Sequence, residues 1–345
     1  MRLSSLCVAS LLFLFIAATP PKKQRVTLKR ETGRVAVLVD GQLFTAYIYP
    51  GPDVLKKPVL YPILTATGNP ITRGWPMDPR PGERIDHPHH VGLWFNYGDV
   101  NGYDLWNNSS AVDPKGMFGT IVNTNVARLN EVGNRAELTV EADWQDRDGK
   151  PMLHETTLFT FTADGPTRRI DRQTTLKAVG NDVIFKDNKE GLIGLRLARQ
   201  LEHPSTKPDL FTDASGKTTA VPKLDNEGVT GKYHSASGID GDAVWGTRAP
   251  WVTLTGTLPK SEAVAVTIID HPGNPGYPTY WHARGYGLFA ANPLAPSVMS
   301  SGKETPMNYT LKAGQSVIFR HRLLISPSTQ SDQALNTEAA QFGKQ

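Results

Sequence analysis

Alternation of apolar and polar residues with a period of two is the feature that most constrains the fold of this chain. A period of two places successive side chains on opposite faces of a β-strand, so such runs predict strands with one buried face. The chain also has 31 glycines and 26 prolines, which separate these runs and disfavour long helices. The predicted strands cover residues 34–39, 43–49, 137–144, 153–161, 168–176, 251–255, 263–269, 287–290 and 316–325.

Many short strands with turn signals between them, and without alternating helices, predict an all-β fold. We expect a large antiparallel β-sandwich that forms a single domain over residues 25–326. A polar tail over residues 327–345 follows, and its segment 331–342 is the one helical candidate. Two smaller β domains with a boundary near residues 217–231 are the alternative.

The first 19 residues have the pattern of a signal peptide. Arg2 supplies the positive start, residues 6–18 form a short apolar core, and small residues end it. This apolar run is shorter than a typical membrane-spanning helix, and no second apolar run follows it. We therefore expect an exported protein, periplasmic or extracellular. The single cysteine, Cys7, lies inside this segment, so any metal in the mature chain would be held by imidazole, carboxylate or carbonyl groups.

Charge and missing motifs exclude several classes of function. The 37 basic and 33 acidic residues are dispersed along the chain, which argues against a nucleic-acid partner. The sequence has no Gly-x-Ser-x-Gly elbow, no phosphate-binding loop and no dinucleotide fingerprint. Serine-esterase chemistry, phosphoryl transfer and hydride transfer are therefore disfavoured.

Three of the nine histidines fall in one short segment, at His87, His89 and His90, directly after Asp86. Histidine has an ordinary pKa near neutrality, so such a cluster indicates proton transfer or metal binding. Pro88 predicts an extended His87, which would direct His87 and His89 to one side and His90 to the other. Acid–base chemistry is favoured over a metal, because no second compact group of ligands accompanies the cluster. The structural alternative is that these imidazoles only bind backbone carbonyls.

Four segments break the strand pattern and have the composition of loops that carry binding groups on a β scaffold, at residues 74–106, 186–194, 232–245 and 270–293. Glu190 is the candidate carboxylate opposite the histidines, although a solvated ion pair with Lys189 is the simpler interpretation. Aromatic, arginine and amide side chains suit the face and hydroxyls of a sugar, although the aromatic rings also suit a core. The candidate substrate-binding residues are Arg73, Trp94, Asp99, Lys189, His234, His271, Trp281, His282, Arg284 and Asn292.

Several motifs together resemble the PmoA-like family of uncharacterised exported bacterial proteins, often labelled "methane oxygenase". They are Thr-Arg-Gly-Trp-Pro at 72–76, Glu-Arg-Ile-Asp-His-Pro-His-His-Val-Gly-Leu-Trp-Phe at 83–95, Gly-Asp-Val-Asn-Gly at 98–102, Lys-Glu-Gly at 189–191, Asp-His-Pro-Gly-Asn-Pro at 270–275 and Arg-Gly-Tyr-Gly-Leu-Phe at 284–289. The resemblance covers nearly the whole mature chain, and the histidine motif is specific to it. The chain departs from the family at Val91, where a basic residue is common.

The label itself does not fit these residues. A membrane methane monooxygenase subunit needs several transmembrane helices, and this chain offers only the signal peptide. The resemblance instead implies an exported β protein associated with sugar breakdown. The predicted sandwich and its closing strand, residues 312–325, also resemble the galactose-mutarotase-like β-supersandwich, which is a likeness of fold alone.

We therefore expect an enzyme that acts on a sugar or glycoside by proton transfer and needs no cofactor. One imidazole of His87, His89 or His90 would act as acid or base, with Glu190 opposing it. Mutarotation, isomerisation, elimination and hydrolysis all use such groups, so the sequence leaves the reaction, the substrate and the oligomeric state open. One alternative is a non-catalytic carbohydrate-binding protein with Trp94 and Trp281 as its platform. The other is an enzyme dependent on a divalent metal, held by His87 and His89 with His271 or Glu190 as a third ligand.

Overall fold

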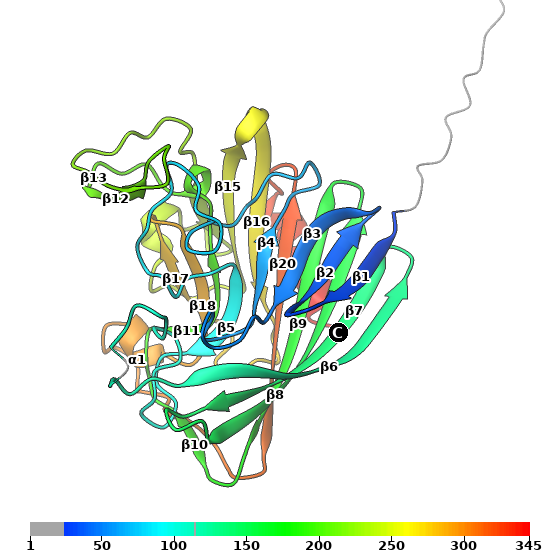
Figure 1. Ribbon diagram of the computed structural model, residues 1–345, viewed down its shortest axis with the longest axis vertical. Helices are drawn as coiled ribbons and strands as arrows, with labels where there is room; N and C mark the ends of the chain where they lie inside the picture. The colour runs from blue at the N-terminus through cyan, green and yellow to red at the C-terminus, as the bar shows by residue number, and fades with distance from the viewer. Residues whose placement is uncertain (1–23, 114) are drawn as a thin grey trace, which may run out of the picture.

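The computed structural model describes residues 24–113 and 115–345, and its main elements are two eight-stranded antiparallel sheets (Figure 1). The predicted signal peptide at 1–19 lies outside the described residues. The strand order is β1-β2-β3-β4-β5-β11-β18-β17 in the first sheet and β14-β15-β16-β20-β9-β8-β7-β6 in the second. This arrangement confirms the predicted large antiparallel β-sandwich.

The first sheet carries the candidate site and consists mainly of short strands. Their bounds are β1 (Val26–Glu31), β2 (Arg34–Val39), β3 (Gln42–Ile48), β4 (Val59–Ile63), β5 (Leu93–Tyr97), β11 (Gly191–Arg196), β17 (Tyr280–Arg284) and β18 (Leu288–Asn292). The second sheet has β6 (Thr120–Val132), β7 (Arg135–Gln145), β8 (Pro151–Asp164), β9 (Thr167–Ala178), β14 (Lys232–Ser235), β15 (Trp251–Leu258), β16 (Glu262–Asp270) and β20 (Ser316–Ser326).

Smaller elements surround these sheets. Two-stranded ribbons are formed by β10 (Val183–Phe185) with β19 (Tyr309–Leu311), and by β12 (Asp209–Thr212) with β13 (Thr218–Val221). The helical elements are α1 (Pro296–Met299), α2 (Asp332–Phe342) and three single 3-10 turns, η1 (Arg199–Leu201), η2 (Gly241–Val244) and η3 (Pro259–Ser261). In the described part of the chain, no helix combines the length and apolarity needed to cross a membrane.

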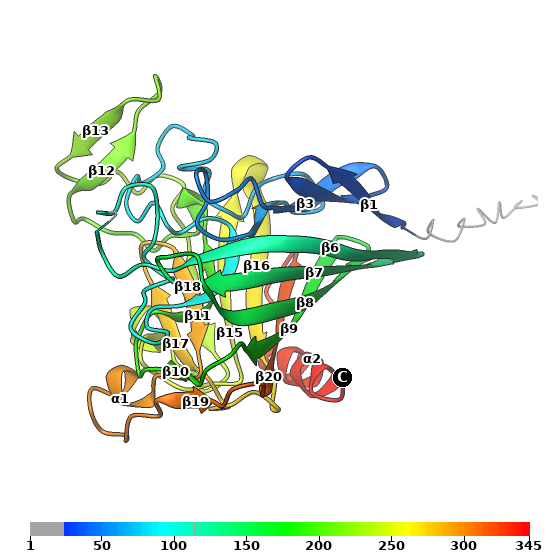
Figure 2. The ribbon, with the colours of Figure 1, turned by 60° about the horizontal axis from the view of Figure 1, so that its bottom comes forward.

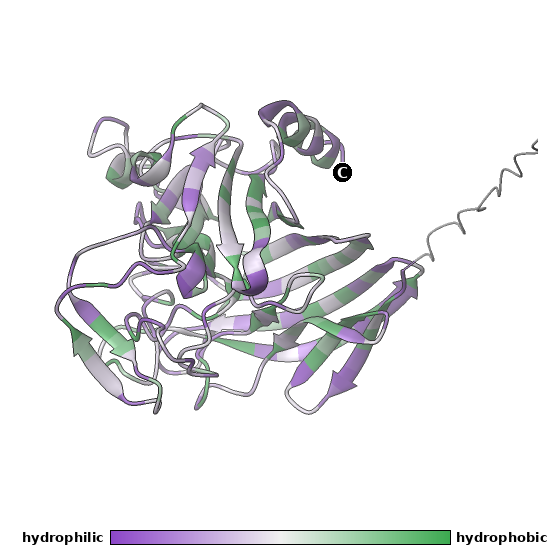
Figure 3. Ribbon diagram, turned by 90° about the horizontal axis from the view of Figure 1, so that it is seen from above, coloured by the Kyte–Doolittle hydropathy of each residue, from purple (hydrophilic) through white to green (hydrophobic). Residues whose placement is uncertain are grey.

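The core between the two sheets is built from alternate residues of the long strands. On β8, Phe159 and Phe161 are fully buried, whereas the intervening Thr160 is partly exposed. Figure 3 shows the same alternation as green and purple bands along the strands of the second sheet. Removing these side chains from water is the main stabilising contribution to such a sandwich. The period of two in the sequence therefore predicted the strands correctly.

The predicted C-terminal helix is confirmed as α2, which lies beside β20 (Figure 2). The Ser331 side chain accepts a hydrogen bond from the Ala334 backbone N–H at 3.2 Å and so caps the first turn. Glu338 then binds Arg322 of β20 at 2.9 Å and Arg169 of β9 at 2.9 Å. These ion pairs hold the polar tail against the outer face of the second sheet.

Candidate functional site

The site is built on the face of the first sheet that points away from the core. Trp94 on β5, Gly194 on β11, Ala290 on β18 and His282 on β17 lie at directly paired positions across four neighbouring strands. Side chains at directly paired positions share one face of a sheet. Trp94 and Ala290 belong to a small apolar cluster that is separate from the main core, so this row faces outward.

Glycine is required in this row because the indole of Trp94 lies across it. A Cβ atom on Gly194 would be only 2.4 Å from the Trp94 ring and 3.0 Å from the Trp106 ring. Two indoles therefore cover the small residues of the sheet and form the base on which the histidine segment rests.

The histidine segment forms a tight turn on this base. The His90 backbone N–H donates to the His87 carbonyl at 3.0 Å, and His87 has φ +47°, in the left-handed region. The expectation that Pro88 would make His87 extended is therefore wrong. The hydrogen-bonded turn and the packing of the rings override the local preference of a residue before proline. As a result all three imidazoles gather on one side, with the rings of His89 and His90 4.3 Å apart.

Four aromatic rings form a continuous stack over the sheet, in the order Tyr286, His87, His90, Trp94. The centroid distances along this four-ring stack are 5.2, 4.8 and 5.1 Å, and the interplanar angles are 1°, 2° and 15°. Each stacked pair of this kind contributes about 0.5–1.5 kcal/mol beyond its buried area. The stack therefore fixes the plane of the His87 ring.

Asp86 orients His87, the partly exposed imidazole of the stack. Its Oδ1 accepts hydrogen bonds from Arg73 at 2.7 Å and Arg196 at 2.5 Å, and its Oδ2 lies 2.5 Å from Nδ1 of His87. Burial alone would raise the pKa of Asp86, but the hydrogen bond to His87 and the charges of Arg196 and Arg73 hold this pKa well below its ordinary value. An ionised Asp86 keeps the proton of a neutral His87 on Nδ1 and leaves Nε2 as the basic nitrogen.

Arg73 holds the histidine turn in place. Its guanidinium, 1% exposed, donates to the backbone carbonyls of Arg84, Asp86, His87 and His90 as well as to the Asp86 carboxylate. A planar guanidinium with five donors suits such a multiple contact. The sequence predicted that Arg73 binds substrate. In the structure its guanidinium makes all of these contacts to other groups of the protein.

Glu190 and His282 are neighbours within the site. Glu190 forms an ion pair with Lys189, and its Oε2 is 3.7 Å from Nδ1 of His282. Burial raises the pKa of Tyr286 to about 12, and the Glu190 and Asp86 carboxylates both act on it in the same direction. The Tyr286 phenol is thus influenced by carboxylates from two segments that are distant in the chain.

Exposure separates the histidines of this site into two kinds. The His87 side chain is 42% exposed, whereas His90 and His282 are each 2% exposed. Burial lowers the pKa of His89 to about 2, that of His282 to about 3, and that of His90 well below its ordinary value. Arg284, whose guanidinium lies over the Trp245 ring at 4.6 Å, adds to the effect on His282. His87 is therefore the histidine best placed to meet a ligand.

Two of the predicted substrate-binding residues are fully buried and donate hydrogen bonds to backbone carbonyls instead. Trp281 neighbours His282 on β17 but faces the core, fully buried, and its Nε1 donates to the Ala249 carbonyl at 2.9 Å. Asn292 is also fully buried, and its Nδ2 donates to the Asn188 carbonyl at 2.8 Å, which holds the segment before Glu190. Trp281 therefore supports the site from the core side of the sheet, and Asn292 supports it by holding the segment that carries Glu190.

Three further candidates do not join the stack. His234 lies on β14, at the edge of the second sheet, and binds Asp240 at 2.7 Å. His271 follows β16 and packs edge-on against Phe342 of α2, with ring centroids 5.2 Å apart. Asp99 accepts a hydrogen bond from the backbone of a local turn. Asp99 and His234 make local structural contacts, and His271 packs against the C-terminal helix.

The sequence interpretation missed two charged residues of the site. Arg196 ends the buried strand β11, and its guanidinium lies over the Tyr286 ring at 5.0 Å. An arginine in an otherwise apolar strand signals a buried anion, here Asp86. Lys57 is buried as well: its Nζ donates to the His89 carbonyl at 2.8 Å, and burial lowers its pKa to about 7.

A metal centre was the alternative for the histidine pair. Within residues 24–113 and 115–345, no group of three His, Cys, Asp or Glu side chains is arranged to hold a metal ion. His87 and His89 have their ring centroids 5.6 Å apart, at 78° to one another. The predicted third ligand for this pair is therefore not found among these residues.

The fold and the site together define an antiparallel β-sandwich protein that carries an exposed Asp–His pair on the outer face of one sheet. The chain belongs to DUF6807, a family of unknown function, whose model matches residues 34–340. No protein with a curated description matches it. The PmoA-like resemblance stays a prediction.

Similar solved structures include three of different kinds. The Slr1438 protein of Synechocystis sp. PCC 6803 is 11% identical, with a TM-score of 0.30, over 92% of this chain and 100% of that chain. Galactose 1-epimerase of Lactobacillus acidophilus NCFM is 9% identical, with a TM-score of 0.33, over 89% of this chain and 99% of that chain. The GH36 α-galactosidase AgaA of Geobacillus stearothermophilus is 12% identical, with a TM-score of 0.33, over 88% of this chain and 41% of that chain. Similarity at this level is too distant to transfer a function to this chain.

Proposed function

We propose that this protein is an exported enzyme that transfers protons on a sugar or glycoside, with His87 as its principal acid–base group. The observation that carries the proposal is the Asp86–His87 pair, in which a partly buried carboxylate binds Nδ1 of an imidazole that is 42% exposed. A carboxylate in this place orients the imidazole ring and fixes which nitrogen faces the ligand.

The roles of the neighbouring groups follow from their burial. Glu190, which lies 3.7 Å from His282 and whose charge acts on Tyr286, is the carboxylate that would exchange the second proton. His89 and His90, whose pKa values burial lowers, are positioning residues that hold the His87 ring in the stack. Mutarotation, isomerisation, elimination and hydrolysis all use an acid and a base placed on either side of a bound sugar ring.

A hydroxyl-rich substrate suits the groups around His87. The partly exposed Tyr286 offers an aromatic ring, Lys189 offers a hydrogen-bond donor beside the Glu190 carboxylate, and Arg284 offers further donors from β17, the strand of His282. Sugars bind through such a mixture of an apolar face and polar groups of both kinds. The PmoA-like motifs of the sequence support the same class of substrate, and the signal-peptide pattern of residues 1–19 supports export.

The test is a panel of sugars and glycosides offered to the wild-type protein, His87→Asn and Glu190→Gln. Anomer exchange of reducing sugars and product formation from methyl and nitrophenyl glycosides are followed by NMR. A general acid or base contributes about 10²–10⁴-fold, so each variant should lose at least about 100-fold of the wild-type rate.

A matched control is available on the second sheet. His154 on β8 is 39% exposed and binds Asp143 at 2.9 Å, so it is a similar Asp–His pair outside the site. His154→Asn should keep the wild-type rate. Full activity of both site variants would refute the proposal, and sugar binding without turnover of any panel member would favour the non-catalytic alternative.

A further inference from the structure

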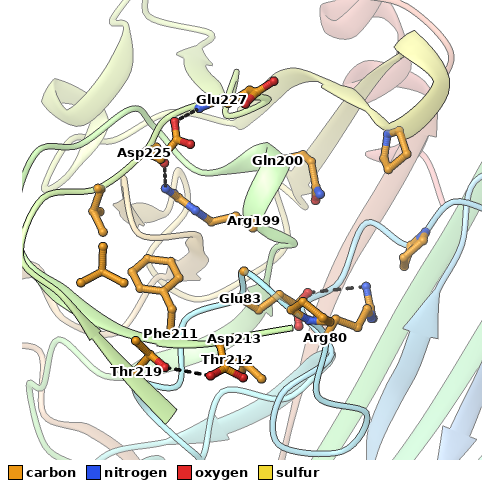
Figure 4. A pocket seen from close by; sticks show the side chains of 16 residues that line it. Arg80, Glu83, Arg199, Gln200, Phe211, Thr212, Asp213, Thr219, Asp225 and Glu227 are labelled. Carbon is orange, nitrogen blue, oxygen red and sulfur yellow. Dashed lines mark hydrogen bonds and ion pairs between the residues drawn. The ribbon is translucent and has the colours of Figure 1, made fainter. Parts of the chain in front are cut away.

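A cavity of about 700 Å³ is lined in part by residues 80–83, which precede the histidine segment in the chain (Figure 4). Its walls come from the segment before the histidine turn, from η1, from the β12–β13 ribbon and from residues 224–227. Small-molecule sites in proteins have volumes of roughly 300–1,000 Å³. The cavity is thus large enough for a ligand of several sugar rings or a comparable molecule.

The polypeptide runs from one wall of the cavity directly to the Asp–His pair. The Thr212 N–H of β12 donates to the Glu83 carbonyl at 2.9 Å, and the Ile85 N–H donates to the Leu210 carbonyl at 3.2 Å, so residues 83–85 are joined to the ribbon by an isolated antiparallel bridge between Arg84 and Phe211. Glu83 lines the cavity and His87 follows four residues later. Four residues span at most about 14 Å, so Glu83 in the cavity wall and His87 lie within that distance of one another.

Buried ion pairs make this wall rigid. Glu202 accepts hydrogen bonds from Arg84 and Arg199, each at 2.7 Å. The two guanidinium groups also lie 5.2 Å from the centre of the Phe211 ring. Cation–π contacts of desolvated arginines are worth up to about 2 kcal/mol each. A wall held in this way is preformed, which reduces the entropy lost when a ligand binds.

The lining favours an uncharged ligand that has both an apolar face and hydroxyl groups. Phe211, Val221 and Leu224 provide apolar surface on one side, and Gln200 and Thr219 provide polar groups. Apart from Glu227, the charged side chains that line the cavity have partners within the protein. Arg80 is paired with Glu83, Arg199 with Glu202, and Asp213 with Ser215 and Thr219.

We propose that this cavity binds the non-reacting end of a neutral oligosaccharide whose reacting unit lies at His87. This inference rests on the proposed function and adds that the substrate is longer than a single sugar. Binding energy from the remote part of a substrate can then be used to position the reacting part. The apolar surface of the cavity would cover the ring faces, and its amide and hydroxyl groups would bind the sugar hydroxyls.

The test measures binding, which does not depend on knowing the reaction. Maltotriose, raffinose and xylotriose are titrated by calorimetry into the wild-type protein, Val221→Trp, Gln200→Ala and Val132→Trp. Val221→Trp fills the cavity and should weaken the binding of the trisaccharide that binds the wild type by at least about tenfold, or about 1.4 kcal/mol. Val132, 66% exposed at the end of β6, is the matched control, and its tryptophan variant should bind like the wild type.

The result also separates this inference from the proposed function. His87→Asn should bind the same trisaccharide within about threefold of the wild type, since the cavity stays intact. Binding of none of the three sugars to the wild-type protein, or equal binding by Val221→Trp with its fold intact by circular dichroism, would overturn the cavity site. The turnover of His87→Asn is measured separately, on single sugars. The cavity site and the catalytic role of His87 can therefore each be refuted without the other.

Discussion

The imidazole of His87 lies parallel to the phenol ring of Tyr286, with ring centroids 5.2 Å apart and planes 1° from parallel. The two residues are 199 positions apart in the chain (286 minus 87) and come from different irregular segments. Their contact closes the outer end of the four-ring stack. The geometry of the proposed site therefore depends on this pair.

Substitution of Tyr286 should change activity through the position of His87. Tyr286→Phe keeps the ring stack and should stay close to the wild-type rate. Tyr286→Ala removes a stack worth about 0.5–1.5 kcal/mol and should lower kcat/KM by up to roughly tenfold. The measurement is steady-state kinetics on whichever sugar the panel identifies, and a fully active alanine variant would argue against a role for the stack.

Removal of the Asp86 charge should destabilise the fold. In Asp86→Asn, the buried guanidiniums of Arg73 and Arg196 lose their shared carboxylate. Loss of one partner of a buried ion pair typically costs about 3–5 kcal/mol, which should appear as a lower urea midpoint at pH 7. Asp143→Asn breaks the more exposed pair with His154 and should cost less than about 1 kcal/mol. Equal losses in both variants would contradict the buried network.

Burial of His282 should make stability depend on pH on the acid side of neutrality. Burial, followed by the charges of Arg284 and Lys189, lowers the pKa of His282 to about 3 in the folded protein. Below an unfolded-state pKa of about 6.5, the unfolded chain binds a proton that the folded chain excludes, so stability falls as the pH is lowered. This residue contributes up to about 1.4 kcal/mol per pH unit between those two values.

The check is a series of urea unfolding curves from pH 7 to pH 4 for the wild type and His282→Asn. Asparagine can still donate to the Lys189 carbonyl, which lies 3.2 Å from Nδ1 of His282. The variant should lose stability less steeply with falling pH. Identical slopes for the two proteins would show that His282 is protonated as easily in the folded state as in the unfolded state.

Gly194→Ala should disrupt the base of the site without touching the Asp–His pair. The added methyl group would lie 2.4 Å from the Trp94 ring, far inside contact distance. Overpacking of this kind typically costs about 1–3 kcal/mol, and here the displaced indole is the end of the four-ring stack. Thermal unfolding and activity should both decline, and a variant with wild-type stability and rate would show that the indole can move freely.

Local patterns in the sequence were sufficient to predict the strands and the C-terminal helix. The alternation in segment 153–161 reappears as the buried and exposed sides of β8, and the polar segment 331–342 forms α2 behind its Ser331 cap. Side-chain periodicity and capping depend on neighbouring residues, so a single sequence carries them. The same holds for the cluster of histidines beside Asp86, which are close together in the chain itself.

Contacts between distant segments could not be predicted in the same way. Trp281 and His282 are adjacent on β17, and the sequence favoured both as site residues, yet one faces the core and the other faces the site. Which face of a strand is buried is decided by the layer that packs against it. Pro88 likewise predicted an extended His87, and long-range packing of the ring produced a left-handed turn instead.

The sequence by itself therefore determined the β architecture, the tail helix and a histidine-rich segment, because these depend on interactions between near neighbours. Only the tertiary structure decided that Asp86 is shared by Arg73 and Arg196, that Tyr286 stacks on His87, and that a cavity lies beside residues 80–85. Each of these features joins residues that are far apart in the chain or buries charges together. The stabilising free energy of such contacts is gained only when the two sheets and their loops have packed.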